Sequence, residues 1–140
     1  MSTPHPEGFG AQLAMRGALD AAGLNPADID YINLHGTASK TNDAAEDKAV
    51  SKVFGRSTPA SSTKGSTGHL LGAAGITEAI ICLLAIEHQT LPGSLHTQEL
   101  DPAMQSHYLL NNLQTRVRRV LSNSFGFGGS NCSLVLGLRA

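Results

Sequence analysis

The sequence has little charge and no large cluster of one sign. Charged residues make up 15% of the 140 residues, and the formal net charge is −1 at pH 7. Its basic cluster, Arg116, Arg118 and Arg119, is smaller than the basic face with which a general nucleic-acid-binding protein contacts phosphates. These features argue against nucleic acid as a partner. The length and the 41% hydrophobic residues are typical of one globular domain with one core.

Cysteine is scarce as well, because the chain has only Cys82 and Cys132 and therefore no disulfide framework. Cys82 lies in an apolar run and Cys132 in an alternating run, which predicts two buried, reduced thiols and a cytoplasmic location. The N-terminus, MSTPHPEGFG, lacks the charged and apolar regions of a signal peptide. The apolar run 70–86 contains Glu78 and is short for a membrane span. We interpret it as a buried helix and expect no membrane partner.

The order of the predicted elements is that of a layered α/β domain without repeats or linkers. Helical spacing of apolar residues predicts a helix over 11–22 that ends at Gly23, and YINLHG (31–36) predicts a buried strand. In the next helix, Asp43 and Glu46 form a capping-box pattern.

The second half of the chain continues this alternation. Gly55 ends the second helix, TPASSTKG predicts a short strand that enters a glycine turn, and 67–87 predicts an apolar helix. RVRRVLSNS and SNCSLVLGLR are two β-like runs joined by FGFGG, which predicts a hairpin. No strand precedes the first helix, although α/β domains usually open with one.

Three glycine-flanked segments each place a polar turn directly after a strand-like run: LHGTASKTND, STKGSTGHLLGAAG and SNSFGFGGSN. Such turns are where α/β proteins gather functional side chains. His69 precedes the apolar helix, whose dipole disfavours imidazolium, so we expect a neutral ring that can donate to a developing oxyanion. Lys64, in the same turn, needs a carboxylate partner if it is buried, and Glu78 is the candidate.

HGTASKTNDAAE, SSTKGSTGHLLGAAGITEAI and SNSFGFGGSN resemble the C-terminal half of β-ketoacyl-acyl carrier protein synthases, the elongating condensing enzymes of fatty acid and polyketide synthesis. The resemblance runs from STPHPEG to the last strand, and the three motifs in this order are highly specific. It implies an α/β, thiolase-like half-domain with a mixed sheet, one buried central helix and a C-terminal β-hairpin. Such enzymes join an acyl thioester to malonyl-acyl carrier protein by decarboxylative Claisen condensation.

The resemblance also implies catalytic residues. His35 and His69 correspond to the two histidines that bind the malonyl thioester carbonyl group and stabilise the enolate. Lys64 corresponds to the lysine that pairs with Glu78 and organises the site.

Further residues receive binding or supporting roles from the same resemblance. Phe127 resembles the gate between the acyl and malonyl sites, with Gly128 and Thr37 beside the substrate. Asp43 and Glu46 match acids that support the site.

The family needs no organic cofactor, and the six histidines show no metal-ligand spacing. Some members hold a structural monovalent cation, at positions that correspond here to Asn33, Glu78, Ser122 and Asn123.

Two departures from the family stand out. The nucleophilic cysteine is absent, because neither Cys82 nor Cys132 lies at a helix N-terminus that would favour a thiolate. The first strand, which we expect at the centre of the family's sheet, has no counterpart either. We therefore expect 1–140 to be a single domain truncated at its N-terminus. The implied partners are acyl carrier protein, the N-terminal ketosynthase half and a second subunit of a homodimer.

Plainer interpretations remain open at this point. They are ordinary core histidines at positions 35 and 69, a simple capping box formed by Asp43 and Glu46, and a core aromatic at Phe127. Alternative functions are a non-catalytic partner that sets chain length, an inactive remnant, and a biosynthetic thiolase.

Overall fold

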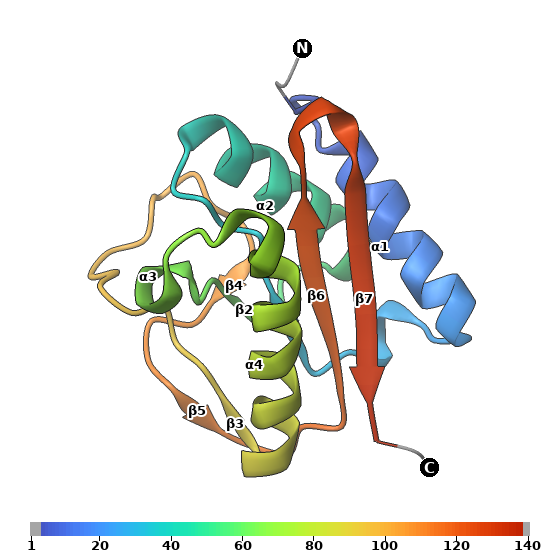
Figure 1. Cartoon of the computed structure of the whole chain (residues 1–140), viewed down its shortest axis with the longest axis vertical. Helices are drawn as coiled ribbons and strands as arrows, with labels where there is room; N and C mark the ends of the chain where they lie inside the picture. Colours follow the sequence, from blue (N-terminus) through green and yellow to red (C-terminus); the bar gives the residue numbers. More distant parts are fainter. Residues whose placement is uncertain (1–3, 139–140) are drawn as a thin grey trace.

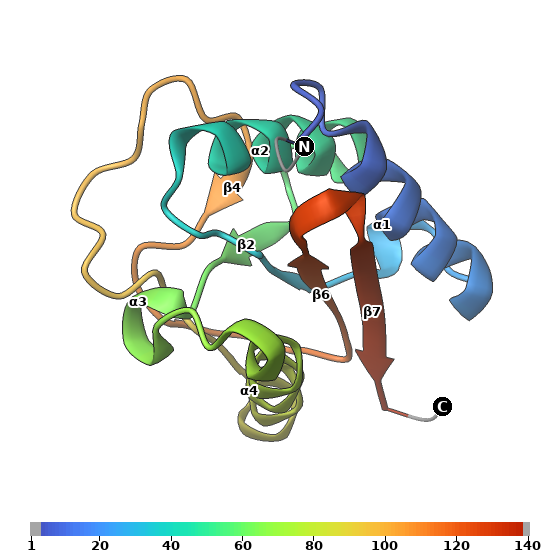
Figure 2. The same cartoon turned by 45° about the horizontal axis from the view of Figure 1, so that its top comes forward.

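The computed structural model describes residues 4–138, in which a five-stranded mixed sheet lies between two layers of helices (Figures 1 and 2). The first residues of the STPHPEG segment lie outside this range. Helices α1 (Phe9–Ala22) and α2 (Lys40–Phe54) cover one face of the sheet, and α4 (Ala74–His88) covers the other, as Figure 2 shows. The predicted layered α/β fold is confirmed.

The sheet has the strand order β4-β2-β1-β6-β7. Strand β1 (Tyr31–Asn33) pairs in parallel with β2 (Pro59–Ser61) and with β6 (Arg119–Phe125). Strand β4 (His107–Tyr108) extends the parallel part, and β7 (Asn131–Gly137) is antiparallel to β6. Because β1 pairs directly with β6, the sheet has no gap at its centre. Our expectation of a missing central strand is therefore wrong for this chain.

Two apolar clusters lie on opposite faces of the sheet. One packs α1 and α2 against it through Met15, Val50 and Leu121. The other packs α4 against it through Cys82, Ile86 and Val120. The neighbouring residues Val120 and Leu121 of β6 belong to different clusters, because successive side chains of a strand point to opposite faces of the sheet.

The sequence predicts the ends of the first two helices correctly. Gly23 ends α1 in the left-handed region (φ 65°), and Gly55 ends α2. The cap of α2 differs from the prediction, because the Ser39 side chain accepts the N–H of Asn42 at 3.2 Å. The prediction of a capping box formed by Asp43 and Glu46 is therefore wrong, since the Glu46 carboxylate accepts hydrogen bonds from another turn instead.

The apolar helix starts later than 67. A one-turn helix, α3 (Lys64–Thr67), ends at Gly68 (φ 74°), and a 3-10 turn, η2 (Leu71–Ala73), leads into α4. Leu71–His88 is long and apolar enough to cross a membrane by length and composition, and 28% of it is buried. Core helices pass the same test, and this one carries a buried, paired carboxylate at Glu78.

Helix α4 buries one side and exposes an apolar side. Its buried side includes Glu78 and Cys82, whereas Ile76, Ile80 and Leu83 are each at least half exposed. An exposed apolar stripe of this kind marks a surface that contacts another protein or protein part.

The remaining elements are short or lie at the C-terminus. The hairpin of β6 and β7 is confirmed and turns through η3 (Phe127–Gly129). Cys82 is buried as predicted, but Cys132 on β7 is exposed, so the prediction of a second buried thiol is wrong. Three further elements complete the chain: η1 (Pro26–Asp28), β3 (Thr90–Leu91) and β5 (Leu113–Gln114), of which β3 and β5 form a separate antiparallel pair.

Candidate active site

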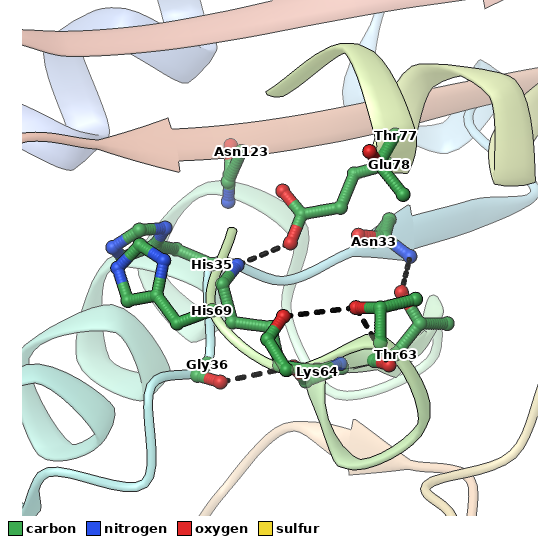
Figure 3. Close-up of polar contacts among 12 residues, drawn as sticks. Asn33, His35, Gly36, Thr63, Lys64, His69, Thr77, Glu78 and Asn123 are labelled. Atoms are coloured by element: carbon green, nitrogen blue, oxygen red, sulfur yellow. Dashed lines mark hydrogen bonds and ion pairs between the residues drawn. The ribbon is translucent and has the colours of Figure 1, made fainter. Parts of the chain in front are cut away.

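Two histidine rings from different motifs meet at the carboxyl end of the sheet. His35 follows β1, and His69 lies between α3 and η2. Their ring centroids are 5.5 Å apart, with the rings nearly perpendicular at 88°, and Figure 3 shows them side by side. Phe125 lies against His35 at 5.6 Å. Both histidines line one cavity of about 720 Å³.

The hydrogen bonds of His69 determine which ring nitrogen is free to donate. Its Nδ1 accepts the backbone N–H of Leu71 at 3.3 Å. In the neutral ring the proton therefore lies on Nε2, which is a donor. The backbone N–H at the start of η2 therefore leaves Nε2 as the nitrogen that can donate into the cavity.

His35 is held in its neutral form by its surroundings. Burial, the charge of Lys64 and the neighbouring His69 together lower the pKa of His35 to about 4, with burial the largest cause. At neutral pH the imidazole of His35 carries no charge, so it can donate one hydrogen bond without acting as an acid.

Lys64 and Glu78 form a buried ion pair behind the histidines, drawn in Figure 3. Lys64 begins α3 and Glu78 lies on α4, so the pair joins two motifs. Burial raises the pKa of the Glu78 carboxyl group, and the hydrogen bond from Lys64 opposes that effect. The predicted pairing is confirmed.

Glu46 holds the turn that carries His35. Its carboxylate accepts the backbone N–H groups of His35 at 2.8 Å and Gly36 at 2.9 Å, and it also accepts the side-chain amide of Asn123 at 3.2 Å. Burial raises the pKa of Glu46 to about 7 despite these bonds. Burial also raises the pKa of Asp43, which lines a separate cavity of about 400 Å³ on the other side of the turn.

The structure gathers some of the predicted residues at the large cavity and leaves others behind it. Its lining includes His35, Thr37, Glu46, His69 and Phe127. Phe127 is 80% exposed at the rim, so it is not a core aromatic.

The other predicted site residues are not part of the lining of this cavity. Gly128 lies in the η3 turn with φ 78°. Sequence reasoning did not single out several polar side chains of the lining, although these four lie within the recognised motifs: Ser39, Asn42, Ser124 and Asn131.

Three buried oxygen atoms beside the Lys64–Glu78 pair have no hydrogen-bond partner among residues 4–138: Asn33 Oδ1, Glu78 Oε2 and Ser122 Oγ. Asn33 and Ser122 are register partners on β1 and β6, on the face that α4 covers. Unpaired buried oxygens are costly, and this set fits a bound cation. The Asn123 side chain is separate from them, because its Oδ1 accepts the Ser133 hydroxyl and its amide bonds to Glu46. In the described chain, no group of three His, Cys, Asp or Glu side chains has the arrangement of a metal site.

Neither cysteine is placed to act as a nucleophile at this cavity. Cys82 is buried in α4, where burial raises the pKa of its thiol to about 12. Cys132 lies on β7 and is not among the residues that line the cavity.

The family model and the similar curated proteins all point to the same class of protein. Residues 1–98 match the family described as beta-ketoacyl synthase, C-terminal domain. The mitochondrial 3-oxoacyl-[acyl-carrier-protein] synthase of Arabidopsis thaliana is 44% identical over 96% of this chain and 31% of its own length. The 3-oxoacyl-[acyl-carrier-protein] synthase 2 of Coxiella burnetii is 41% identical over 97% of this chain and 34% of its own length.

Solved structures agree with this class. The ketosynthase ApeO in complex with its chain length factor ApeC, from Xenorhabdus doucetiae, matches with a TM-score of 0.94 and 48% identity, over 99% of this chain and 36% of that one. A type II polyketide acyl-carrier protein in complex with its ketosynthase, AntDE:AntF, matches with a TM-score of 0.94 and 28% identity, over 100% and 35% of the two chains.

The chain therefore belongs to the family of β-ketoacyl synthase C-terminal domains, condensing enzymes with the thiolase-like fold. It spans about a third of the length of the curated relatives that it matches.

Proposed function

We propose that the chain is the malonyl-binding and decarboxylating part of a β-ketoacyl-acyl carrier protein synthase, an acyltransferase of fatty acid or related polyketide synthesis. The observation that carries this proposal is the edge-to-face pair of His35 and His69 in one cavity. The buried Lys64–Glu78 pair behind them supports it, because it fixes charge beside the rings without exposing it.

In the proposed reaction, the thioester oxygen of the malonyl group accepts hydrogen bonds from His35 and His69. The bond between C2 and the malonyl carboxylate carbon breaks, its electron pair forms the enolate, and carbon dioxide leaves. Two N–H donors stabilise the negative oxygen by hydrogen bonds, without transferring a proton to it. In a complete synthase the enolate carbon then attacks an acyl thioester. Without that acceptor, water protonates C2 and acetyl thioester is the product.

The remaining residues receive supporting roles in this proposal. Phe127 at the rim, with Gly128 in the same turn, would gate the cavity, and Thr37 would contact the substrate arm. Glu46 and Asp43 would support the His35 turn.

A monovalent cation is the group that the orphaned oxygens fit. Asn33, Glu78 and Ser122 would hold it, and it would supply positive charge beside Glu78.

The acyl group would be held on a cysteine outside this chain, because Cys82 and Cys132 are not placed to hold it. We propose that the N-terminal ketosynthase half provides this cysteine and packs on the exposed apolar side of α4. Acyl carrier protein would deliver both substrates, and the whole synthase would be a cytoplasmic homodimer.

The test is decarboxylation of malonyl-acyl carrier protein by the purified chain, followed as acetyl-acyl carrier protein by mass spectrometry. We expect slow product formation that His69→Ala reduces at least tenfold, because one of two oxyanion donors is lost. His88→Ala, on the last turn of α4 away from the cavity, is the control and should leave the rate unchanged. Equal rates for wild type and His69→Ala would contradict the proposal and favour a non-catalytic partner subunit.

A further inference from the structure

Ser62 lies between the turn that carries His35 and the turn that carries Lys64. It directly follows β2, next to the end of β1, where the last backbone bond of the ladder runs from the N–H of Leu34 to the carbonyl of Ser61 at 2.8 Å. Beyond that bond the two turns leave the sheet, and the ladder no longer fixes their relative position.

The Ser62 hydroxyl bonds to both turns. It donates to the carbonyl oxygen of Gly36 at 3.0 Å and accepts the backbone N–H of Lys64 at 3.4 Å. In the described part of the chain, its bond to Gly36 is the one hydrogen bond between residues 35–37 and residues 62–67. A serine that bonds only to its own turn is common, but this acceptor lies 26 residues away.

Gly36 has the backbone conformation and the lack of a side chain that this contact requires. Its φ is 41°, and a Cβ atom at this position would lie 2.5 Å from Ser62 Cβ and 2.6 Å from Ser62 Oγ. Only glycine allows the two turns to approach so closely. Glu46 accepts hydrogen bonds from the N–H groups of the same turn, and Ser62 donates one to its carbonyl oxygen. The two side chains together hold the turn in place.

We propose that Ser62 is a positioning residue that fixes the His35 turn relative to the Lys64 turn, by donating to the Gly36 carbonyl and accepting from the Lys64 N–H. This inference rests on the proposed function, since it concerns the geometry of the same site. Errors of about 1 Å in such geometry reduce rates by about 100-fold. The proximity of Lys64 is also one cause of the lowered pKa of His35, so loosening the link should change that value.

The test compares Ser62→Ala with Ser66→Ala in the same chain. Ser66 is exposed on α3, and among the described residues its side chain makes no hydrogen bond, so it controls for loss of a hydroxyl in this segment. We expect Ser62→Ala to lower kcat for decarboxylation by about 10- to 100-fold with KM changed less than about threefold. Histidine NMR titration should show the pKa of His35 moving up towards its ordinary value. Ser66→Ala should change neither quantity.

The two readouts separate this inference from the proposed function. If the wild-type chain releases no carbon dioxide, the proposed function fails, while the NMR titration still tests Ser62. An unchanged His35 pKa in folded Ser62→Ala would overturn the positioning role. If Ser62→Ala does not fold, Ser62→Cys keeps the shape with a weaker donor. It should show a smaller shift in the same direction, and no shift would again overturn the role.

Discussion

Glu46 is a buried acid whose carboxylate accepts hydrogen bonds from two main-chain N–H groups and one side-chain amide, and it has no salt bridge among residues 4–138. Three N–H groups point at its carboxylate, yet burial still raises its pKa to about 7. The acid therefore binds a proton more tightly in the folded chain than in the unfolded chain. The stability that this proton provides is complete below about pH 4.5 and is lost as the pH rises through about 7.

Glu46→Gln removes this titration. Between pH 4.5 and 8, we expect the unfolding free energy of the wild type to fall by about 3 kcal/mol relative to that of the variant, since one pKa unit corresponds to about 1.4 kcal/mol. Urea unfolding at a series of pH values measures both curves. Parallel curves would show that Glu46 does not titrate differently in the two states.

Lys64 neutralises a carboxylate that has no access to water. Lys64→Met leaves Glu78 buried without its partner, so we expect a loss of about 3 to 5 kcal/mol in unfolding free energy. Lys64→Met with Glu78→Gln should recover part of that loss, because no charge then remains buried. Lys48→Met, which breaks an exposed pair with Glu7, is the control and should have a much smaller effect. Similar losses from the buried and the exposed pair would contradict this account.

At the scale of elements, helix α2 shows where local pattern and tertiary contact disagree. Asp43 and Glu46 have capping-box spacing, but Ser39 caps the helix one turn earlier. Glu46 is drawn away by two N–H groups of a turn that the sequence places 10 and 11 residues upstream. Pattern reasoning cannot detect such a competitor, because the contact exists only after β1 and α2 pack together.

Helix α4 has an apolar side that is exposed. Ile80→Lys with Leu83→Lys should abolish association with a separately expressed N-terminal half of a ketosynthase. The change should leave the melting temperature of the chain within a few degrees, because both side chains are about half exposed. Leu13→Lys, at an equally exposed site on α1 across the sheet, is the control and should bind normally. Pull-down and thermal melting measure the two effects. Retained binding by the α4 variant would move the interface elsewhere.

At the scale of the whole molecule, the sequence predicts the layers and the final hairpin because each depends on local periodicity. It does not predict β3, β4 and β5, each of two residues, since no periodic pattern fits into so short a run. It also wrongly predicts a missing central strand, because strand order depends on contacts between distant segments. The pairing of Lys64 with Glu78 was predictable, since a buried lysine requires an acid and few acids were available.

The whole chain should not carry out condensation by itself. We expect no β-ketoacyl product from acyl- and malonyl-loaded carrier protein, because no thiol of the chain lies at the histidine cavity. Product should form only when a polypeptide with an acylated cysteine is added. Mass spectrometry of the carrier protein distinguishes the cases, and product from the chain alone would refute this expectation.

The central strand β1 has consequences for synthesis on the ribosome. Its neighbour β6 pairs Val120 with Tyr31, so about 90 residues separate the two sides of this ladder. As the chain leaves the ribosome, β1 lacks one of its two neighbours in the sheet until Arg119–Phe125 has emerged. A nascent chain stalled before β6 would present two open helical layers to chaperones, and native structure would form in one late, cooperative step.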